Sequence, residues 1–292
     1  MTPVELLDRC DFPATAGRLN LGVSGGADSM AMALLARAAG RDIVMWHVHH
    51  GLRAEADDDA ELVAKKAAEW GVPFELRRID LEPGPDLEGR AREARYRALP
   101  ADVCVGHTAD DRAETVLLNL LRGAGLAGVA ARLDRVHRPI RQLRRADTVA
   151  LCAAMEIMVV DDAMNHDARF RRVIVRDQVL PLLAEGFDRD PVPLLNRHAD
   201  LVADALEVVQ AAAAAIDATD VHSLRTAPRA VATEAIRQWI AGDLGSIDGV
   251  DLAAIDRVLL VVDGTHLATE LPGGHRVART GGVLRIEPVV RQ

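Results

Sequence analysis

The stretch LNLGVSGGADSMAMALLARAA, Leu19–Ala39, decides the fold class. Its first part, Leu19–Val23, is a short apolar run, which predicts a buried strand. From Ser29 onward it is rich in Ala, Leu and Met, which predicts a buried helix. The turn between them, SGGADS, occupies Ser24–Ser29. This order of elements indicates a phosphate site, because the start of a helix offers free backbone amides and a positive dipole end.

Each residue of this turn, hereafter the SGGADS loop, suits that interpretation. Gly25 and Gly26 allow a tight turn and close approach of a phosphate. Ser24 and Ser29 add hydroxyl donors, whereas Asp28 would repel a bare phosphate and therefore predicts Mg²⁺ as a bridge. A purely structural turn with helix caps is the alternative. No GK[ST] follows the glycines, so a P-loop kinase or GTPase is not expected. The candidate nucleotide-binding residues here are Ser24, Gly25, Gly26, Ala27, Asp28 and Ser29.

Strand and helix patterns alternate up to about residue 190. Further strands are predicted at residues 43–48, 74–79, 103–106 and 157–160, and helices at 57–70, 88–99, 110–122 and 146–155. This alternation predicts an α/β fold with a doubly wound parallel sheet. In such sheets ligands bind beyond the carboxyl ends of the strands, where the motifs of this chain fall.

The pattern changes beyond Pro191 and Pro193, so we expect a catalytic domain over 1–190 and a smaller domain over 191–292. Helices are predicted at residues 194–216, 230–241 and 252–259. Period-two segments at 266–271, 275–280 and 283–286, separated by glycine turns, predict a small meander of strands.

The composition excludes several classes of protein. Hydrophobic residues make up 49%, which is typical of a globular chain. The start of the chain is not a signal peptide, and no segment has the ~20 apolar residues that cross a bilayer, so we expect a cytoplasmic protein without a membrane partner. Three scattered cysteines suggest neither a zinc ribbon nor a disulfide framework. The net charge of -9 does not favour nucleic-acid binding, but the arginines cluster, and a phosphate backbone meets a local patch. The oligomeric state stays open, a homodimer included.

A second motif, HVHHGLR at His47–Arg53, follows the second strand on the same rim as the SGGADS loop. Three histidines in four positions can suggest a metal site, yet no matching cysteine or carboxylate cluster accompanies them. We therefore expect the backbone at His47 and Val48 to meet adenine.

A third motif begins at Gly106 and reads GHTADDRAET. Thr108 or Asp110 is the expected helix cap. Because two adjacent carboxylates cannot both cap, one is expected to remain for Mg²⁺ or a cationic substrate. The helix ends at Arg122 in a glycine turn, where Arg122 can reach phosphate.

These strings together resemble one family. SGGADS by itself is similar to the PP-loop of ATP pyrophosphatases, which cleave ATP between the α and β phosphates. With HVHHGLR, AREARY at Ala91–Tyr96 and GHTADDRAETVLLNLLRGAG from Gly106, the chain resembles the tRNA(Ile)-lysidine synthetases. Further similar strings lie at Asp161–Asp167, Arg169–Arg176 and Glu270–Gly274, so the likeness spans most of the chain.

The resemblance implies a two-step ligase that uses ATP and Mg²⁺. ATP would activate the oxygen on C2 of the wobble cytidine in an isoleucine tRNA with a CAU anticodon, and free lysine would then displace AMP to give lysidine. It implies a role for Asp111 with the lysine amine, and Asp28 is expected to hold the metal. Arg92 and Arg95 are candidates for gripping the nucleotide or developing charge, or else form a solvated helix face. Gly106 joins the nucleotide site, and Arg122, Arg172 and Arg176 are candidates for RNA phosphate.

The chain departs from the family pattern at two positions and in length. Thr108 stands where histidine is frequent, Val173 where asparagine is common, and the C-terminal region is short. A PP-loop thiolation enzyme is the rival enzyme, although Cys10, Cys104 and Cys152 are isolated. A non-catalytic RNA-binding protein is the rival of another class, and it predicts a degraded SGGADS loop.

Overall fold

The computed structural model describes residues 1–15, 17–49, 51, 56–80, 87–131, 136–160, 170–245 and 249–289. The chain forms two compact units, each described here by itself. The first comprises Met1–Gly123 and Ala131–Ala199, and the second comprises Ala124–Ala130 and Asp200–Gln292. The units part inside a helix, between Ala199 and Asp200, and the sequence-based boundary at residue 190 stays a prediction.

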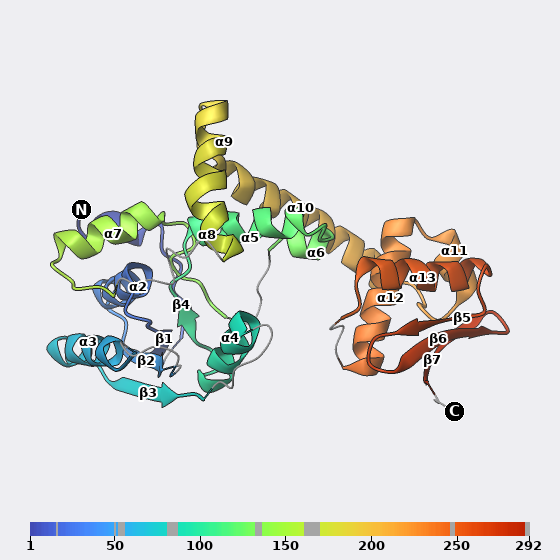
Figure 1. Ribbon diagram of the computed structural model, residues 1–292, viewed down its shortest axis with the longest axis horizontal. Coiled ribbons are helices and arrows are strands. Elements are labelled where there is room, and N and C mark those ends of the chain that lie inside the picture. The colour runs from blue at the N-terminus through green and yellow to red at the C-terminus, as the bar shows by residue number, and fades with distance from the viewer. Residues whose placement is uncertain are drawn as a thin grey trace. The chain divides into compact units, whose positions relative to one another are not determined.

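The first unit alternates strands and helices, as Figure 1 shows. In chain order its elements are α1 (Val4–Leu7), β1 (Leu19–Gly22), α2 (Ala27–Ala38), β2 (Ile43–His49), α3 (Ala56–Glu69), β3 (Phe74–Arg78), α4 (Leu87–Ala98), β4 (Cys104–Val105), α5 (Ala109–Leu121), α7 (Arg145–Ala154), α8 (Arg171–Ile174), the π-helical turn η2 (Val175–Val179), α9 (Leu180–Phe187) and the start of α10 (Pro191–Ala214).

The four strands form a parallel sheet in the order β3-β2-β1-β4. Leu19 of β1 pairs with Ile43 of β2, and Leu21 of β1 pairs with Cys104 of β4. The strand order reverses between β1 and β4, because β2 and β3 extend to one side of β1 and β4 lies on the other. This reversal is where α/β sheets bind ligands, at the carboxyl ends of the strands. The predicted parallel α/β fold is confirmed.

The core explains why α2 follows the SGGADS loop without interruption. Every residue from Ser29 to Ala36 is buried, and small alanines alternate with Met and Leu along the helix. A helix buried all round must lie between other layers rather than on the surface. α2 packs beside α7 and against β2 (Figure 1). The position of Asp28 in the first turn of α2 is therefore fixed by the packing of the whole helix.

The predicted fifth strand at residues 157–160 is wrong, since that segment contains no strand. Its backbone amides have other partners. The Ile157 amide donates to the Cys152 carbonyl at the end of α7 (2.9 Å), and the Val160 amide donates to the Gly25 carbonyl (3.0 Å). An apolar run that reads as a strand here braces the SGGADS loop instead.

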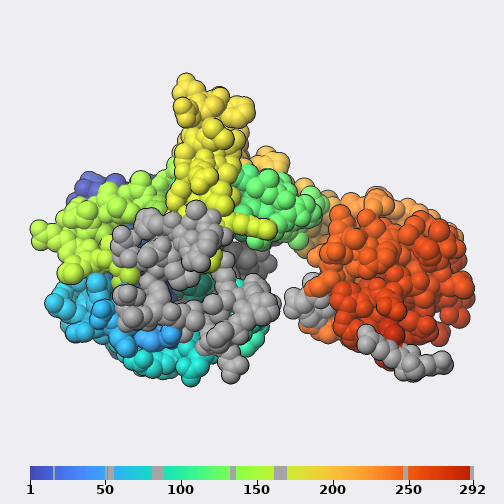
Figure 2. Space-filling view, in the orientation of Figure 1, coloured from blue at the N-terminus to red at the C-terminus, as the bar shows by residue number. Residues whose placement is uncertain are grey.

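α8, η2 and α9 run continuously from Arg171 to Phe187, a helix that the sequence did not reveal. The Leu180 amide donates to the Val175 carbonyl five residues earlier, a π-type bond. α9 stands out from the surface in Figure 2, where it is yellow. Its Leu182 and Phe187 side chains are 67% and 76% exposed.

The second unit contains the helices and the short sheet that the sequence predicted. Its elements are α6 (Leu126–Val129), the remainder of α10, α11 (Val221–Thr226), α12 (Arg229–Leu244), α13 (Leu252–Asp263), β5 (Ala268–Leu271), β6 (His275–Thr280) and β7 (Val283–Pro288). The strands are antiparallel in the order β5-β6-β7. Ile236, Ile240 and Ile255 are fully buried in a separate core.

Candidate active site

The SGGADS loop has the strained geometry that its glycines imply. Gly25 has a φ of +94°, a region that side chains rarely adopt. A Cβ at Gly25 would also lie 2.6 Å from Cγ2 of Val160. Gly26 is extended and caps α2, which begins at Ala27. The backbone therefore turns sharply between β1 and α2, and the first amides of α2 face the rim of the sheet.

The two serines of the loop have different surroundings. Ser29 is buried, and its hydroxyl donates to the Gly26 carbonyl at 2.9 Å. Its oxygen also accepts from the Ser24 amide at 3.1 Å. Ser24 is exposed. Ser29 thus shapes the loop from within, and Ser24 is the hydroxyl on the open side.

Gly106 brings the end of β4 against the first turn of α2. A Cβ at Gly106 would lie 2.8 Å from both the Asp28 carbonyl oxygen and the Ser29 Cα. His107 follows, and its Nδ1 accepts from Nε of Arg138 at 3.1 Å. The SGGADS loop and the third motif are thus adjacent at the reversal of the sheet.

Asp28 is the central carboxylate of the loop. Its Oδ1 accepts from the buried Thr148 hydroxyl, and its Oδ2 lies 3.6 Å from Nε of Arg145. Burial raises its pKa to about 6, aided by the charge of Asp111 and opposed by Thr148 and Arg145. Burial thus disfavours the ionised form of Asp28, and a cation bound there would favour it again.

A cluster of opposite charges adjoins Asp28. Arg145, in the first turn of α7, donates to Asp111 Oδ1 and Glu114 Oε1, each at 3.0 Å. Arg172 donates from Nε to Glu114 Oε2 at 2.6 Å and from Nη2 to the Asp111 carbonyl oxygen at 3.0 Å. Glu114 is only 1% exposed, which is tolerated because both of its oxygens are paired. We call Asp28, Asp111, Glu114, Arg145 and Arg172 the charge cluster.

Asp111 is both a helix cap and a member of the charge cluster. Thr108 is the N-cap of α5, as expected, and the Thr108 amide donates to Asp111 Oδ2 at 2.8 Å in a capping box. Burial acts to raise the pKa of Asp111, but Arg172 and Arg145 outweigh it and hold that pKa below its usual range. Asp111 is therefore an anion throughout the physiological range.

Both adjacent carboxylates, Asp110 and Asp111, have protein partners in this structure, and the expectation that one of them is available for Mg²⁺ or a cationic substrate stays a prediction. Asp110 accepts from Nη2 of Arg144 at 2.9 Å and from the Arg145 amide at 2.8 Å. Arg144 also contacts Asp190, just before α10. Both carboxylates are satisfied because α7 begins with two arginines that face the start of α5.

The described residues of the second motif, His47–His49 and Gly51, lie on the same rim as the SGGADS loop. His47 is buried, and its Nδ1 donates to the Val23 carbonyl at 2.8 Å, so the ring supports the strand beside the SGGADS loop. Val48 points to the other face of β2. Among the described residues no three His, Cys, Asp or Glu side chains are grouped so as to hold a metal ion. His50 and Arg53 lie outside the described residues.

The predicted arginines have different positions. Arg172 belongs to the charge cluster, so its guanidinium serves Asp111 and Glu114. Arg122 caps α5 and is exposed, and Nε of Arg176 donates to Asp177 at 2.7 Å. Arg95 stacks on the ring of Tyr96, with Cζ 5.4 Å from its centre. The side chain of Arg92 and the string Asp161–Asp167 lie outside the described residues.

The sequence reasoning missed Arg145, Glu114 and Thr148. One signal was available for Glu114, because it follows Asp111 by three positions and therefore shares a helix face with it. Arg145 is the last of six arginines between residues 132 and 145, which form a basic block. Nothing in the local sequence distinguished it.

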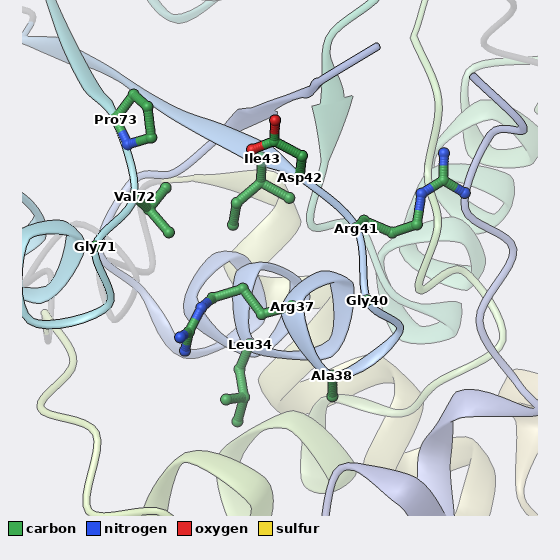
Figure 3. Close-up of a pocket in the computed structure, with 10 residues that line it drawn as sticks. All are labelled: Leu34, Arg37, Ala38, Gly40, Arg41, Asp42, Ile43, Gly71, Val72 and Pro73. Carbon is green, nitrogen blue, oxygen red and sulfur yellow. The ribbon is translucent and has the colours of Figure 1, made fainter. Parts of the chain in front are cut away.

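A hollow of about 370 Å³ lies at the amino ends of the strands, where β2 and β3 begin, and not at the carboxyl ends that carry the SGGADS loop (Figure 3). Its two arginines point away from each other. Arg37 donates to the Trp70 carbonyl at 3.3 Å, and Arg41 donates to the Pro13 carbonyl at 2.7 Å. These guanidinium groups hold neighbouring loops, and the hollow contains none of the predicted site residues.

Comparison with known proteins identifies the family of this chain. Residues 5–183 match a family described as a PP-loop domain. A tRNA(Ile)-lysidine synthase of Nocardia farcinica is 38% identical over 93% of this chain and 88% of its own length. One from Cutibacterium acnes is 33% identical over 90% and 89%, and one from Solibacter usitatus is 35% identical over 89% of this chain but 65% of that longer protein.

A solved structure supports the fold. The U34-tRNA thiolase NcsA from Methanococcus maripaludis, with its [4Fe-4S] cluster, superimposes with a TM-score of 0.57 over 68% of this chain and 78% of its own, at 16% identity. In the described part of the chain, no helix combines the length and the apolar character needed to span a bilayer. The matched domain and the close relatives that cover nearly the whole chain lead to one conclusion: this chain is an ATP-using PP-loop protein and belongs to the tRNA(Ile)-lysidine synthase family.

Proposed function

We propose that this chain joins lysine to C2 of the wobble cytidine in isoleucine tRNA with a CAU anticodon, with conversion of ATP to AMP and pyrophosphate. One observation carries the proposal beyond family membership. Arg145 lies 3.6 Å from Asp28 of the SGGADS loop and 3.0 Å from both Asp111 and Glu114. A phosphate loop and a carboxylate pair suited to an amine are therefore parts of one site.

In the first step the cytidine oxygen attacks the α-phosphorus of ATP and pyrophosphate leaves. The backbone amides of the SGGADS loop and the start of α2 would hold the leaving pyrophosphate. The nucleoside would lie over the neighbouring strand ends, at Gly106 and at the backbone of His47 and Val48. Cytidine is a weak nucleophile, so the main contribution of the protein is to hold its oxygen in line with the phosphorus.

Asp28 is the proposed Mg²⁺ ligand. Mg²⁺ in nucleotide sites commonly uses one or two carboxylates together with phosphate oxygens. Asp28 fits, since it is a partly exposed carboxylate in the first turn of α2, at the end of the SGGADS loop. When bound there, Mg²⁺ would offset the charge on the pyrophosphate.

In the second step the ε-ammonium of lysine first gives one proton to water, and the neutral amine attacks C2. The C2–O bond then breaks so that AMP leaves, and a second proton passes from the nitrogen to water, so that the nitrogen keeps one hydrogen in the product. Asp111 is proposed to receive the lysine ammonium, and Glu114 on the same face of α5 would assist it. Because its pKa is lowered, Asp111 suits the task of anchoring charge better than that of accepting a proton.

The RNA contacts form a separate proposal. Arg122, at the end of α5, and Arg176 would meet tRNA phosphate, as would residues of the second unit. Arg95 with Tyr96, and Arg92 one turn earlier on α4, would grip the nucleotide or the extruded base. Since such contacts release counterions, tRNA binding should weaken as salt rises.

The burial and the pKa of the cysteines argue against a reaction that transfers sulfur through a protein thiol. Cys104 and Cys152 are buried, and burial raises the pKa of each thiol to about 11. Burial also raises the pKa of the Cys10 thiol to about 11. Thiols of this kind are poor nucleophiles at neutral pH.

Radiolabelled lysine, ATP and an isoleucine tRNA transcript test the proposal directly. Label should enter the tRNA, one AMP should form for each lysine, and a transcript with the wobble cytidine changed should take up none. Asp28→Ala should abolish AMP formation, and Asp111→Asn should raise the lysine KM and impair transfer. Absence of label in a tRNA that the protein demonstrably binds would rule the function out.

A further inference from the structure

Every oxygen of the two carboxylates proposed to receive lysine has a protein partner, and three of the four oxygens contact a guanidinium. Asp111 Oδ1 accepts from Arg145 at 3.0 Å and lies 3.3 Å from Arg172, while Oδ2 accepts from the amide and hydroxyl of Thr108. Glu114 Oε1 accepts from Arg145, and Oε2 accepts from Arg172. This pair already holds two guanidinium groups, so a lysine ammonium would be a third cation and can bind well only if one guanidinium withdraws.

Arg172 is the less movable of the two guanidiniums. It makes a 2.6 Å bond to Glu114 and also donates to the main-chain oxygen of Asp111, an acceptor that does not change with ligand charge. The helix that carries it contributes Val173 and Val175 to buried positions. Arg172 thus acts as a fixed counter-charge for Glu114.

Arg145 also has its guanidinium close to a third carboxylate, that of Asp28. Its Nε already lies 3.6 Å from Asp28 Oδ2, on the side of the SGGADS loop where the phosphates of ATP are proposed to bind. Its main chain is held independently of the side chain, because its amide donates to Asp110 Oδ2 at 2.8 Å and α7 begins there. The guanidinium can therefore shift toward the loop without moving α7.

We propose that Arg145 couples ATP binding to lysine binding: it occupies the Asp111–Glu114 carboxylates until the triphosphate draws its guanidinium toward the SGGADS loop. Guanidinium groups bind phosphate oxygens as strongly as they bind carboxylates, so the triphosphate offers Arg145 an alternative partner. Lysine then meets carboxylates with one competing cation fewer. This inference rests on the proposed function, since it assumes that Asp111 and Glu114 receive lysine.

Coupling of this kind is reciprocal. If ATP raises the affinity for lysine by some factor, lysine must raise the affinity for ATP by the same factor. Couplings between sites commonly lie at about 5–150-fold. A residue with a merely structural role changes both affinities but gives no reason for one ligand to alter the other.

The test is calorimetry of L-lysine binding to the full-length protein, with and without saturating Mg²⁺ and α,β-methylene-ATP, which cannot be cleaved at the reactive bond. For the wild type we expect lysine to bind at least about tenfold more tightly with the nucleotide, and the nucleotide to gain equally from lysine. In Arg145→Gln, lysine should bind without nucleotide, and the coupling should fall to within about twofold of none. Arg145→Lys, which keeps a cation but loses the fork of donors, should retain part of the coupling.

Arg172→Lys is the matched comparison, because it alters the same carboxylates from the other side. It should change the lysine Kd in both conditions while leaving the ratio near that of the wild type. Equal lysine affinity with and without nucleotide in the wild type overturns the inference, and this measurement needs no variant. Full coupling in a folded Arg145→Gln protein overturns it as well.

The failure of this inference can be told apart from failure of the proposed function. If the wild type incorporates labelled lysine into tRNA yet shows no coupling, the function stands and the role of Arg145 is refuted. If lysine neither binds with nucleotide nor enters tRNA, both are refuted.

Discussion

Gly106→Ala offers a sharp test of how the SGGADS loop is held. The new Cβ would lie 2.8 Å from the Asp28 carbonyl oxygen and the Ser29 Cα, and 2.9 Å from the Asp28 carbonyl carbon. Carbon atoms in contact prefer a separation of about 3.5 Å or more, so the shortfall is roughly 0.7 Å. All three neighbours are backbone atoms, so no side chain can rotate away. The first turn of α2, with Asp28, must move instead.

Two opposing free energies set the size of the effect. Overpacking costs about 1–3 kcal/mol, and removal of a glycine from the unfolded chain returns about 0.4–1 kcal/mol. We expect a net destabilisation of roughly 0–2.6 kcal/mol, or a fall in Tm of up to about 10 °C for a unit of this size. The catalytic loss should be larger than this suggests, because a displacement of about 1 Å at a reacting centre can reduce the rate on the order of 10²-fold.

Gly22→Ala is the matched control, since Gly22 lies on the neighbouring strand β1. Its Cβ would have its closest contacts at 3.6 Å, an ordinary van der Waals distance. The assays are thermal unfolding and kcat/KM for ATP in tRNA-dependent AMP formation. If Gly106→Ala matches Gly22→Ala in both, close approach of β4 to α2 does not position the loop.

The pKa of Asp28, the buried thiols and the contact between Arg138 and His107 can each be tested. Because the folded-state pKa of Asp28 is raised to about 6 from 3.8, its contribution to stability is fully present below about pH 4 and is lost as the pH rises through 6. Asp28→Asn should therefore raise Tm at pH 7.5, by up to the equivalent of about 3 kcal/mol, and abolish AMP formation. Two results would contradict this direction: a variant less stable than the wild type at pH 7.5, or a Tm difference between variant and wild type that is as large at pH 4 as at pH 7.5. Cys152→Ala and Cys104→Ala, singly or together, should leave lysine incorporation within about threefold of the wild type, because buried thiols of high pKa take no part in the chemistry; loss of incorporation in folded protein would revive sulfur chemistry. Since a guanidinium only donates, the hydrogen bond from Arg138 requires an unprotonated Nδ1 on His107. Nitrogen NMR of the wild type should show the ring proton on Nε2, and Arg138→Met should remove that preference. A proton on Nδ1 in the wild type would refute the contact.

Local patterns in the sequence were sufficient for most of the fold. The strands and helices of the sheet follow from apolar periodicity and from glycine punctuation, both of which report hydrogen bonds made within a few residues. The prediction that Thr108 or Asp110 caps α5 succeeded for the same reason, since a cap bonds to its own helix. The SGGADS loop also depends on local backbone geometry, and Gly25 has the positive φ that only glycine adopts readily.

Failures occurred where a distant partner decides the structure. Residues 157–160 have the composition of a strand, but the amide of Val160 is taken by Gly25, which lies 135 positions earlier in the chain. The helix from Arg171 to Phe187 was hidden by Pro181, whose missing N–H argues against a continuous helix. A π-type turn just before Pro181 accommodates it, and that turn cannot be read from apolar spacing.

The charge cluster shows why only part of the candidate site could be predicted from the sequence. Asp28 and Asp111 could be named as candidates because each stands in a recognisable string beside a strand end. The basic block held several arginines with nothing local to separate them, and the partner of each depends on where α7 begins relative to α5. The start of α7 gives Arg144 to Asp110 and Arg145 to Asp111, Glu114 and Asp28. Neighbouring residues of one type thus have unlike contacts: Arg144 joins the start of α7 to α5, while Arg145 lies between the SGGADS loop and the carboxylates proposed to receive lysine. Long-range packing, rather than any motif, selects which arginine takes the position between them.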